Sequence, residues 1–161
     1  MTVDTATAAE HAWISRAIEL ATSNVAEGGG PFGALIVRDG EIVATGTNRV
    51  TPDLDPTAHA EVTAIRNACR ALGDYGLRGC VLVTSCEPCP MCLASALWAR
   101  VDRIVFAADR DDAAAAGFDD RAFHDALRDP AACPVPVQRI DSADRNAAFA
   151  AWSAKADRVD Y

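Results

Sequence analysis

An Asp39-Gly40 pair between two largely apolar runs is the sequence feature that most constrains the fold. The runs are residues 34–37 and 42–45, and a two-residue Asp-Gly connection is a strong signal for a β-hairpin. Further apolar runs predict strands at residues 80–84, 104–107 and 135–140. A hairpin followed by strands that alternate with helices predicts an α/β fold. We expect a mixed five-stranded sheet with helices on both faces, which makes three layers, α/β/α.

Helical periodicity separates these strands. Apolar residues recur at helical spacing, and this predicts helices at residues 8–26, 57–72, 88–100, 119–127 and 143–155. The segments at residues 48–56 and 113–117 are predicted to be loops. In sheets of this kind, ligands bind at the end of the central strands where loops lead into helices. We therefore expect the functional site at that end.

The chain of 161 residues has the size of one domain, 1–161, and no repeat or low-complexity linker divides it. Half of its residues are hydrophobic and 24% are charged, which is an ordinary globular balance. The longest stretch without a charged residue, residues 88–99, is well short of the roughly 20 apolar residues of a membrane span. The N-terminus is acidic and lacks a basic segment, so no signal peptide is predicted.

The net charge of −8 argues against nucleic acid or an anionic membrane as the main partner. Without a secretory signal, the six cysteines are expected to be reduced thiols in the cytoplasm rather than disulfides. Three of them nevertheless crowd into one short segment as Cys86, Cys89 and Cys92. Such crowding calls for a metal or a redox explanation.

Two of these cysteines are predicted to share the first turn of a helix. Cys89 and Cys92 are three residues apart, so they face the same side of the helix that begins near Pro88. The unpaired N–H groups and the positive dipole end at that turn favour thiolate over thiol. Taken alone, Cys-x-x-Cys is often a redox pair or half of a structural zinc site.

His59 can provide a third ligand from the start of another predicted helix. One histidine and two thiolates leave a fourth tetrahedral position open, which is typical of catalytic zinc. Glu61 projects differently from His59 and is expected to move protons between the activated water and a leaving amine. Cys86 is either a fourth ligand or a packing residue, and its place in the turn before the helix favours packing. The remaining cysteines are expected to be small core residues: Cys69, Cys80 and Cys133.

The combination of His-x-Glu with Pro-Cys-x-x-Cys resembles the signature of the zinc-dependent deaminases that act on nucleobases, nucleosides and nucleic acids. Longer segments are similar to bacterial guanine deaminases of the cytidine-deaminase-like fold: residues 30–33 (GPFG), 55–66 (DPTAHAEVTAIR), 84–92 (TSCEPCPMC) and 116–120 (AGFDD). This resemblance extends over residues 13–161. The GFDD segment and the terminal Tyr161 are the features that point to the guanine deaminases within this larger group of deaminases.

The resemblance implies a role for each residue that matches the family. Zinc would be held by His59, Cys89 and Cys92, and Glu61 would carry the proton. The purine would be bound by Asn48, the backbone at Ala60, the rings of Phe32 and Trp98, Asp120 in preference to Asp119, and Tyr161. The resemblance also implies a homodimer in which the C-terminal segment, about residues 143–161, is swapped onto the partner.

The residues alone allow simpler explanations for these purine contacts. Those explanations are core packing for Phe32 and Trp98, helix capping for Asp119 and Asp120, a turn for Asn48, and a frayed end for Tyr161. The acidic run at residues 109–112 also departs from the family pattern, which bears on the choice of aspartate.

The predicted function is the hydrolytic deamination of guanine, a small purine base, to xanthine and ammonia. Rival substrates for the same chemistry are guanosine, ammeline and cytosine-type bases. A tRNA adenosine deaminase has the same zinc core, but the charge of −8 speaks against RNA. Rivals from other classes are a non-catalytic zinc domain and a redox pair, and Glu61 beside an open ligand position argues against the zinc domain.

Overall fold

The structure, a computed structural model, describes residues 6–161 and divides into two compact units, Met1–Asp120 and Arg121–Tyr161. The elements of the first unit are, in chain order, α1 (Ala8–Ala26), β1 (Gly33–Arg38), β2 (Glu41–Thr47), α2 (Val50–Asp53), α3 (Ala60–Leu72), β3 (Cys80–Cys86), α4 (Pro90–Trp98), β4 (Arg103–Ala108) and α5 (Arg110–Ala115). The elements of the second unit are α6 (Arg121–Arg128), the short 3-10 helix η1 (Pro130–Ala132) and α7 (Ala147–Ala154).

The first helix, α1, has the boundaries that the sequence predicts, because Thr7 caps its first turn. The Thr7 hydroxyl accepts a hydrogen bond from the backbone N–H of Glu10 (3.2 Å), and the Glu10 carboxylate accepts one from the N–H of Thr7 (2.6 Å). This reciprocal pair satisfies two N–H groups that the helix itself leaves unpaired. After the helix, Gly28 has a φ of 86°, so the chain turns into the glycine-rich loop there.

The described strands form one mixed sheet in the order β2-β1-β3-β4. β1 pairs antiparallel with β2 and with β3, and β3 pairs parallel with β4. Asp39 and Gly40 have φ values of 51° and 82°, the left-handed conformation that a tight hairpin turn requires at both central positions. The predicted hairpin and the mixed sheet are therefore confirmed.

The predicted fifth strand at residues 135–140 is wrong, because the sheet has four strands and none of these residues lies in one. The segment belongs to the second unit, which has no strand among its elements to pair with it. Pro136 also has no N–H to contribute to a ladder. Val137 and Ile140 are 85% and 73% exposed, so the apolar pattern of this segment does not reflect burial within the chain.

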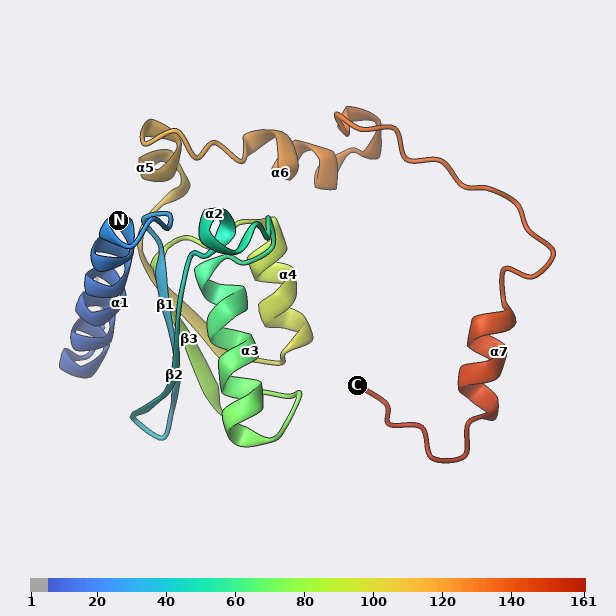
Figure 1. Ribbon diagram of the computed structural model, residues 1–161, viewed down its shortest axis with the longest axis horizontal. Coiled ribbons are helices and arrows are strands. Elements are labelled where there is room, and N and C mark those ends of the chain that lie inside the picture. The colour runs from blue at the N-terminus through green and yellow to red at the C-terminus, as the bar shows by residue number, and fades with distance from the viewer. Residues whose placement is uncertain (1–5) are drawn as a thin grey trace. The chain divides into compact units, whose positions relative to one another are not determined.

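Helices cover both faces of the sheet, which gives the predicted three layers (Figure 1). On one face, α1 packs against β1 and β3, and Ala17 is buried with Leu35, Val37 and Val83. On the other face, α3 and α4 cover a larger apolar cluster that includes Ile36. Successive residues of β1 therefore point into opposite layers, as the two-residue period of a strand requires.

The helices α3 and α4 begin slightly later than the sequence predicts. The residues directly before them, His59 and Cys89, have extended backbones with ψ values of 158° and 168° and occupy the N-cap positions. The first N–H groups of a helix have no partner within it, so an N-cap side chain lies at a cluster of free donors. Each later start thus places a predicted zinc ligand at the N-terminus of a helix.

Two segments predicted to be loops contain short helices. The segment at residues 48–56 includes α2, whose C-cap residue Leu54 has a φ of 52°. The segment at residues 113–117 begins inside α5, whose N-cap Asp109 accepts hydrogen bonds from the N–H groups of Asp111 and Asp112. Helices of this length contain too few residues for hydrophobic periodicity to indicate them.

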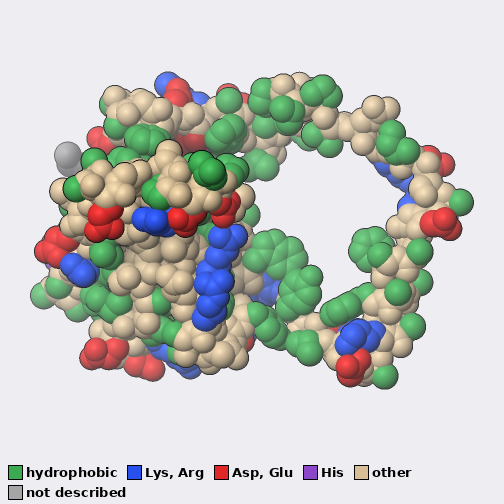
Figure 2. Space-filling view, in the orientation of Figure 1, with side chains coloured by type: hydrophobic (Ala, Val, Ile, Leu, Met, Phe, Trp, Pro, Cys, Tyr) green, Lys and Arg blue, Asp and Glu red, His purple; other side chains and the backbone are tan. Residues whose placement is uncertain are grey.

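The second unit leaves most of its large apolar side chains exposed, and hydrophobic side chains are visible along its surface in Figure 2. These side chains are Phe123, Leu127, Val135, Val137, Ile140, Phe149, Trp152, Val159 and Tyr161. α6 lies close to its predicted place, whereas α7 begins at Ala147, later than the predicted residue 143. Within residues 6–161, no helix is long and apolar enough to cross a bilayer.

Candidate metal centre and active site

The side chains of His59, Cys89 and Cys92 converge where α3 and α4 begin. Cys92 lies on the first turn of α4 and is fully buried. One imidazole nitrogen and two thiol sulfurs all lie within 4.8 Å of one another. The Nδ1 atom of His59 is 3.6 Å from the sulfur of Cys89 and 3.4 Å from the sulfur of Cys92. The structure thus brings together the three residues that the sequence predicts as ligands.

This set of donors fits zinc. Thiolate sulfur and imidazole nitrogen are usual protein ligands of zinc, and three protein ligands leave the fourth tetrahedral position for a reactant. In the part of the chain that the structure describes, no other group of three histidine, cysteine or acidic side chains meets the same distance limit. The cluster therefore has the composition of an open, catalytic zinc site rather than a closed, structural one.

The two thiols of the cluster hold their protons very differently. A hydrogen bond from the Cys92 thiol lowers the pKa of Cys89 to about 4, and the contact with His59 lowers it further against the opposing effect of burial. The same bond, with burial and the nearby Glu61, raises the pKa of Cys92. The bond to Cys89 also raises the pKa of His59. Cys89 is thus the more readily ionised of the two thiols, and a bound cation favours thiolate at both cysteines.

Glu61 lies on the first turn of α3, with only 6% of its surface exposed. Burial is the main reason that the pKa of its carboxyl group is raised, and the negative charge of Cys89 adds to this effect. A raised pKa suits a carboxylate that must both accept and release a proton. Glu61 interacts with Cys92 but is not part of the ligand cluster. Its position therefore suits a proton carrier beside the metal.

Cys86 stays outside the ligand cluster. It ends β3, is buried, and its thiol donates to the carbonyl oxygen of Asp109 at 3.7 Å. Burial raises the pKa of this thiol to about 11, so it keeps its proton at neutral pH. The structure therefore places Cys86 as a packing residue. Of the other cysteines, Cys80 is buried, as expected of a core residue, whereas Cys69 and Cys133 are only partly buried.

Three of the predicted purine contacts are linked to the cluster through the backbone. Ala60 directly follows the histidine ligand, is fully buried, and has its N–H on the first turn of α3. Asn48 follows β2, and its neighbour Arg49 donates its N–H to the carbonyl of Ala58 at 2.8 Å, one residue before the histidine. Phe32 precedes β1, and its carbonyl accepts the N–H of Asn48 at 3.1 Å.

Three other predicted contacts lie elsewhere in the chain. Trp98 ends α4, six residues beyond Cys92, and is 66% exposed. Because a helix rises about 1.5 Å per residue, Trp98 lies at the opposite end of α4 from the ligands. Asp120 is the last residue of the first unit. Tyr161, in the second unit, packs its ring edge-on against Trp152 with the centroids 6.3 Å apart. The contacts of these three residues with a substrate stay predictions.

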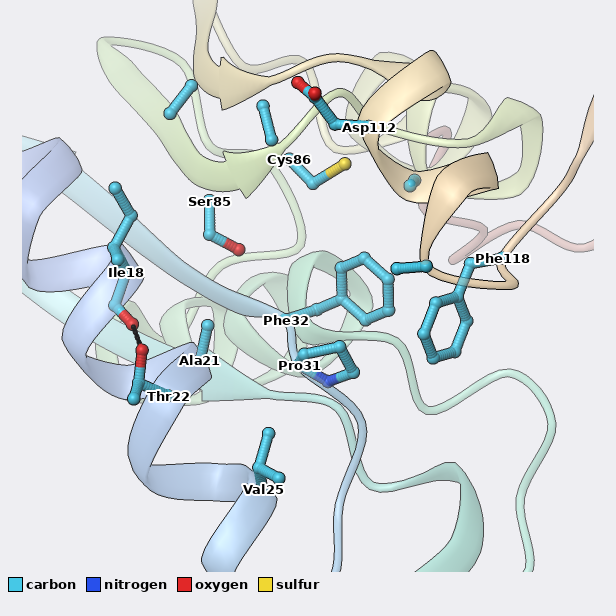
Figure 3. Close-up of a pocket in the computed structure, with 14 residues that line it drawn as sticks. Ile18, Ala21, Thr22, Val25, Pro31, Phe32, Ser85, Cys86, Asp112 and Phe118 are labelled. Carbon is cyan, nitrogen blue, oxygen red and sulfur yellow. Dashed lines mark hydrogen bonds between the residues drawn. The ribbon is translucent and has the colours of Figure 1, made fainter.

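A pocket of about 550 Å³ opens beside α1, α5 and the ends of β3 and β4 (Figure 3). Phe32 and Phe118 lie together on one side of it, with ring centroids 4.9 Å apart and planes at 86°. The lining is mainly apolar, and it includes neither the three metal ligands nor Glu61. The pocket is therefore separate from the metal cluster, and Phe32 is the only predicted purine contact that lines it.

The structure shows two interactions near the site that the sequence analysis missed. Asn24, near the end of α1, is buried and binds the backbone of the loops on which Gly30 and Asn48 lie. Glu87, two residues before the first cysteine ligand, accepts hydrogen bonds from the backbone and the side chain of Arg110. Glu87 directly precedes the Pro-Cys-x-x-Cys motif, which was an available signal, whereas nothing in the residues next to Asn24 indicates its role.

A buried carboxylate beside an open His/Cys/Cys cluster, held at two helix N-termini of an α/β/α fold, is the arrangement of a zinc-dependent deaminase. The sequence also matches the cytidine and deoxycytidylate deaminase zinc-binding region over residues 7–108. The chain therefore belongs to the cytidine and deoxycytidylate deaminase zinc-binding family, which confirms the predicted class and fold.

Similarity to one characterised relative extends over nearly the whole chain. The chain is 48% identical to the guanine deaminase of Bacillus subtilis (strain 168) over 151 residues, which are 92% of this chain and 97% of that protein. The X-ray structure of the Bacillus subtilis guanine deaminase matches with a TM-score of 0.91 and 47% identity, covering 94% of this chain and 98% of that chain.

Two further similarities are more limited in extent. The crystal structure of the protein NE0047 in complex with 2,6-diaminopurine matches with a TM-score of 0.68 and 40% identity, covering 71% of this chain and 64% of that chain. The tRNA-specific adenosine deaminase of Aquifex aeolicus (strain VF5) is 45% identical over 78 residues, which are 48% of this chain and 52% of that protein. The similarity to the tRNA enzyme thus covers about half of the chain.

Proposed function

We propose that the protein is a guanine deaminase, which converts guanine and water to xanthine and ammonia in the breakdown of purine bases. The observation that carries the proposal is that the chain resembles a guanine deaminase over nearly its full length. Its own fold also assembles the ligand cluster and Glu61. A domain with a purely structural zinc has no use for a buried carboxylate beside an open ligand position.

Zinc held by His59, Cys89 and Cys92 would supply a Lewis acid that activates water at neutral pH. The carboxylate of Glu61 accepts the proton that this water gives up and passes protons to the ring nitrogen and to the leaving amino group. A C–O bond forms at the carbon that bears the amine, and the C–N bond to ammonia breaks. The burial of Glu61 keeps bulk water away from these transfers.

The purine base is proposed to be bound by hydrogen-bond donors that the fold leaves available. The N–H of Ala60 lies on the first turn of α3, where the helix provides no acceptor. This N–H and the side-chain amide of Asn48 would donate to acceptors on the edge of the base, and Phe32 would pack against the ring. Donors matched to one edge of guanine would be left unpaired by a different base, which gives selectivity.

We also propose that the protein is a homodimer in which about residues 143–161 of each chain close the site of the partner. The exposed apolar side chains of the second unit support this proposal, since a set of this size is normally covered in a soluble protein. Tyr161 would then reach the partner's substrate, and Trp98 and Asp120 would line the same enclosed space.

A tRNA adenosine deaminase is the main alternative within the family. Such an enzyme must bind an RNA backbone, which usually requires clustered basic residues. This chain has a net charge of −8 and a single lysine, Lys155, which favours a small, free base over a nucleic acid. Guanosine, ammeline and cytosine-type bases are alternatives that the chemistry of the cluster does not separate from guanine.

We place the protein in a reducing compartment, the cytoplasm. Cys89 and Cys92 can bind zinc only as free thiols, and all six cysteines of the chain are free in the structure. A disulfide between these two would remove two of the three ligands.

The experiment that tests the proposed function is an ammonia-release assay with the zinc-loaded protein. Guanine, guanosine, adenine, cytosine, cytidine and ammeline are compared at equal concentration, with an unmodified tRNA as a seventh substrate. We expect the highest rate with guanine. A higher rate with any other substrate would overturn the substrate assignment, and release from none would overturn the activity.

A further inference from the structure

We infer that Asn24 is a positioning residue that fixes the orientation of Asn48 toward the substrate. The inference rests on the proposed function, because that function makes Asn48 a ligand of the purine. Asn24 lies on the third-last position of α1, well away from the sequence motifs that define the metal centre. It has only 1% of its surface exposed.

The side chain of Asn24 ties two loops together. Its Nδ2 atom donates to the carbonyl oxygens of Gly30 and of Asn48, each at 2.8 Å. Both partners are acceptors, so the amide can only have its NH₂ group on this side. Its Oδ1 atom is buried and has no hydrogen-bond partner among the described residues. The contribution of Asn24 is therefore its two donors, which a carboxylate of the same shape would lack.

The glycine-rich loop is shaped around this amide. A Cβ atom at Gly29 would lie 2.2 Å from Nδ2 of Asn24 and 2.4 Å from the carbonyl oxygen of Asn48. The N–H of Gly29 also donates to the carbonyl oxygen of Asn24 at 3.0 Å. Only glycine lets the loop approach both asparagines this closely.

The backbone that Asn24 holds then sets the side chain of Asn48. The Oδ1 atom of Asn48 accepts the N–H groups of Gly30 at 3.4 Å and of Val50 at 3.3 Å. With its oxygen held in this way, the Nδ2 atom of Asn48 is the end left to donate to a substrate. Moving Gly30 or the Asn48 backbone would rotate that donor, so Asn24 acts on the substrate through Asn48.

The two loops that Asn24 holds connect to Phe32 and to the metal ligands. The N–H of Phe32 donates to the carbonyl of Gly30 at 2.9 Å, and the N–H of Arg49 donates to the carbonyl of Ala58 at 2.8 Å. The metal ligands themselves make no hydrogen bond to Asn24 among the described contacts. We therefore expect loss of Asn24 to impair substrate binding while zinc binding is retained.

The test compares Asn24→Ala and Asn24→Asp with a matched control, Asn67→Ala. Asn67 also lies on a helix and donates to a backbone carbonyl, that of Thr45 at 2.9 Å, but it is exposed and holds neither loop. For zinc-loaded protein and guanine, we expect both Asn24 variants to raise KM about tenfold or more, with kcat changed less. An interaction made equally in the ground and transition states acts on KM in this way. The control should leave both constants unchanged.

A double-mutant cycle separates positioning from general destabilisation. If Asn24 acts through Asn48, then Asn24→Ala should change KM little in an Asn48→Ala background. Independent, multiplicative effects on KM in the two backgrounds would overturn the inference. So would an Asn24→Ala protein with normal KM. If that variant does not fold, Gly29→Ala is used in its place, because its Cβ atom disturbs the same contact from the loop side.

A second measurement needs no activity and so distinguishes this inference from the proposed function. Amide hydrogen exchange of Gly30 and Val50 is compared in the wild type, Asn24→Ala and Asn67→Ala, all without substrate. We expect faster exchange at both amides in Asn24→Ala only, because both N–H groups donate to Asn48. Unchanged exchange would overturn the inference even in an active guanine deaminase. Faster exchange in a protein that is inactive on guanine would contradict only the proposed function.

Discussion

The sulfur of Cys92 lies 3.4 Å from the Nδ1 atom of His59, although 33 residues separate the two in the chain. The strands β2 and β3 both pair antiparallel with β1, so they run in the same direction. The chain continues from β2 toward α3 and from β3 toward α4, which brings the two helix starts together. Each start adds free N–H groups and a positive dipole end, which favour anionic thiolates. The fold thus prepares a cation site before any metal is bound.

The metal assignment predicts about one zinc per chain, lost when a ligand is replaced. Cys89→Ser should lose most of its zinc and its activity, because a serine hydroxyl does not replace a thiolate on zinc. Metal analysis of the purified protein measures this directly. The control is Cys133→Ser, which removes a thiol of the second unit outside the cluster and should keep full zinc content. Full zinc in Cys89→Ser would refute the ligand set.

The role of Glu61 predicts a variant that binds zinc but does not convert its substrate. Glu61→Gln preserves the size of the side chain and removes its ability to accept a proton. We expect unchanged zinc content and a fall in kcat of about 10²–10⁴-fold, the usual range for general acid–base catalysis. Glu19→Gln, at an exposed position of α1, is the matched control. A Glu61→Gln enzyme within about tenfold of the wild type would show that another group moves the proton.

Much of the site could be predicted from the sequence because its determinants are local. The three-residue spacing of Cys89 and Cys92, the approximate helix starts and the Asp39-Gly40 turn all follow from neighbouring residues. The false strand at residues 135–140 has the opposite cause, since a strand exists only with a partner that local pattern does not reveal. Asn24 could not be predicted for the same reason, because its hydrogen bonds span two separate loops.

The contact between β2 and α3 predicts a strong effect at Gly46. A Cβ atom there would lie 2.3 Å from the carbonyl oxygen of Ala60 and 2.3 Å from the N atom of Ala64. Neither backbone atom can move without shifting α3, so Gly46→Ala should lower the free energy of unfolding by about 1–3 kcal/mol or more. Urea denaturation measures the loss. Gly76→Ala, whose nearest neighbour would be at 3.5 Å, should change stability by less than about 0.5 kcal/mol.

The proposed swapped dimer predicts that the last residues matter for activity and not for folding. Deleting residues 159–161 removes Tyr161, which we propose closes the partner's site. We expect guanine turnover to fall about tenfold or more, the scale of one buried hydrogen bond, with little change in zinc content or melting temperature. Unchanged kinetics would show that the end of the chain takes no part. Sedimentation of the full-length protein as a monomer would contradict the dimer itself.

Whether this chain deaminates guanine is measured by following xanthine formation from guanine by absorbance, with the zinc-loaded, full-length protein. We expect one xanthine and one ammonia per guanine consumed. We also expect a kcat/KM of about 10⁴ M⁻¹s⁻¹ or higher, as is usual for an enzyme on its own substrate, and a lower value for guanosine. A zinc-loaded protein that forms no xanthine from guanine, or that prefers guanosine, would show that guanine is not its substrate.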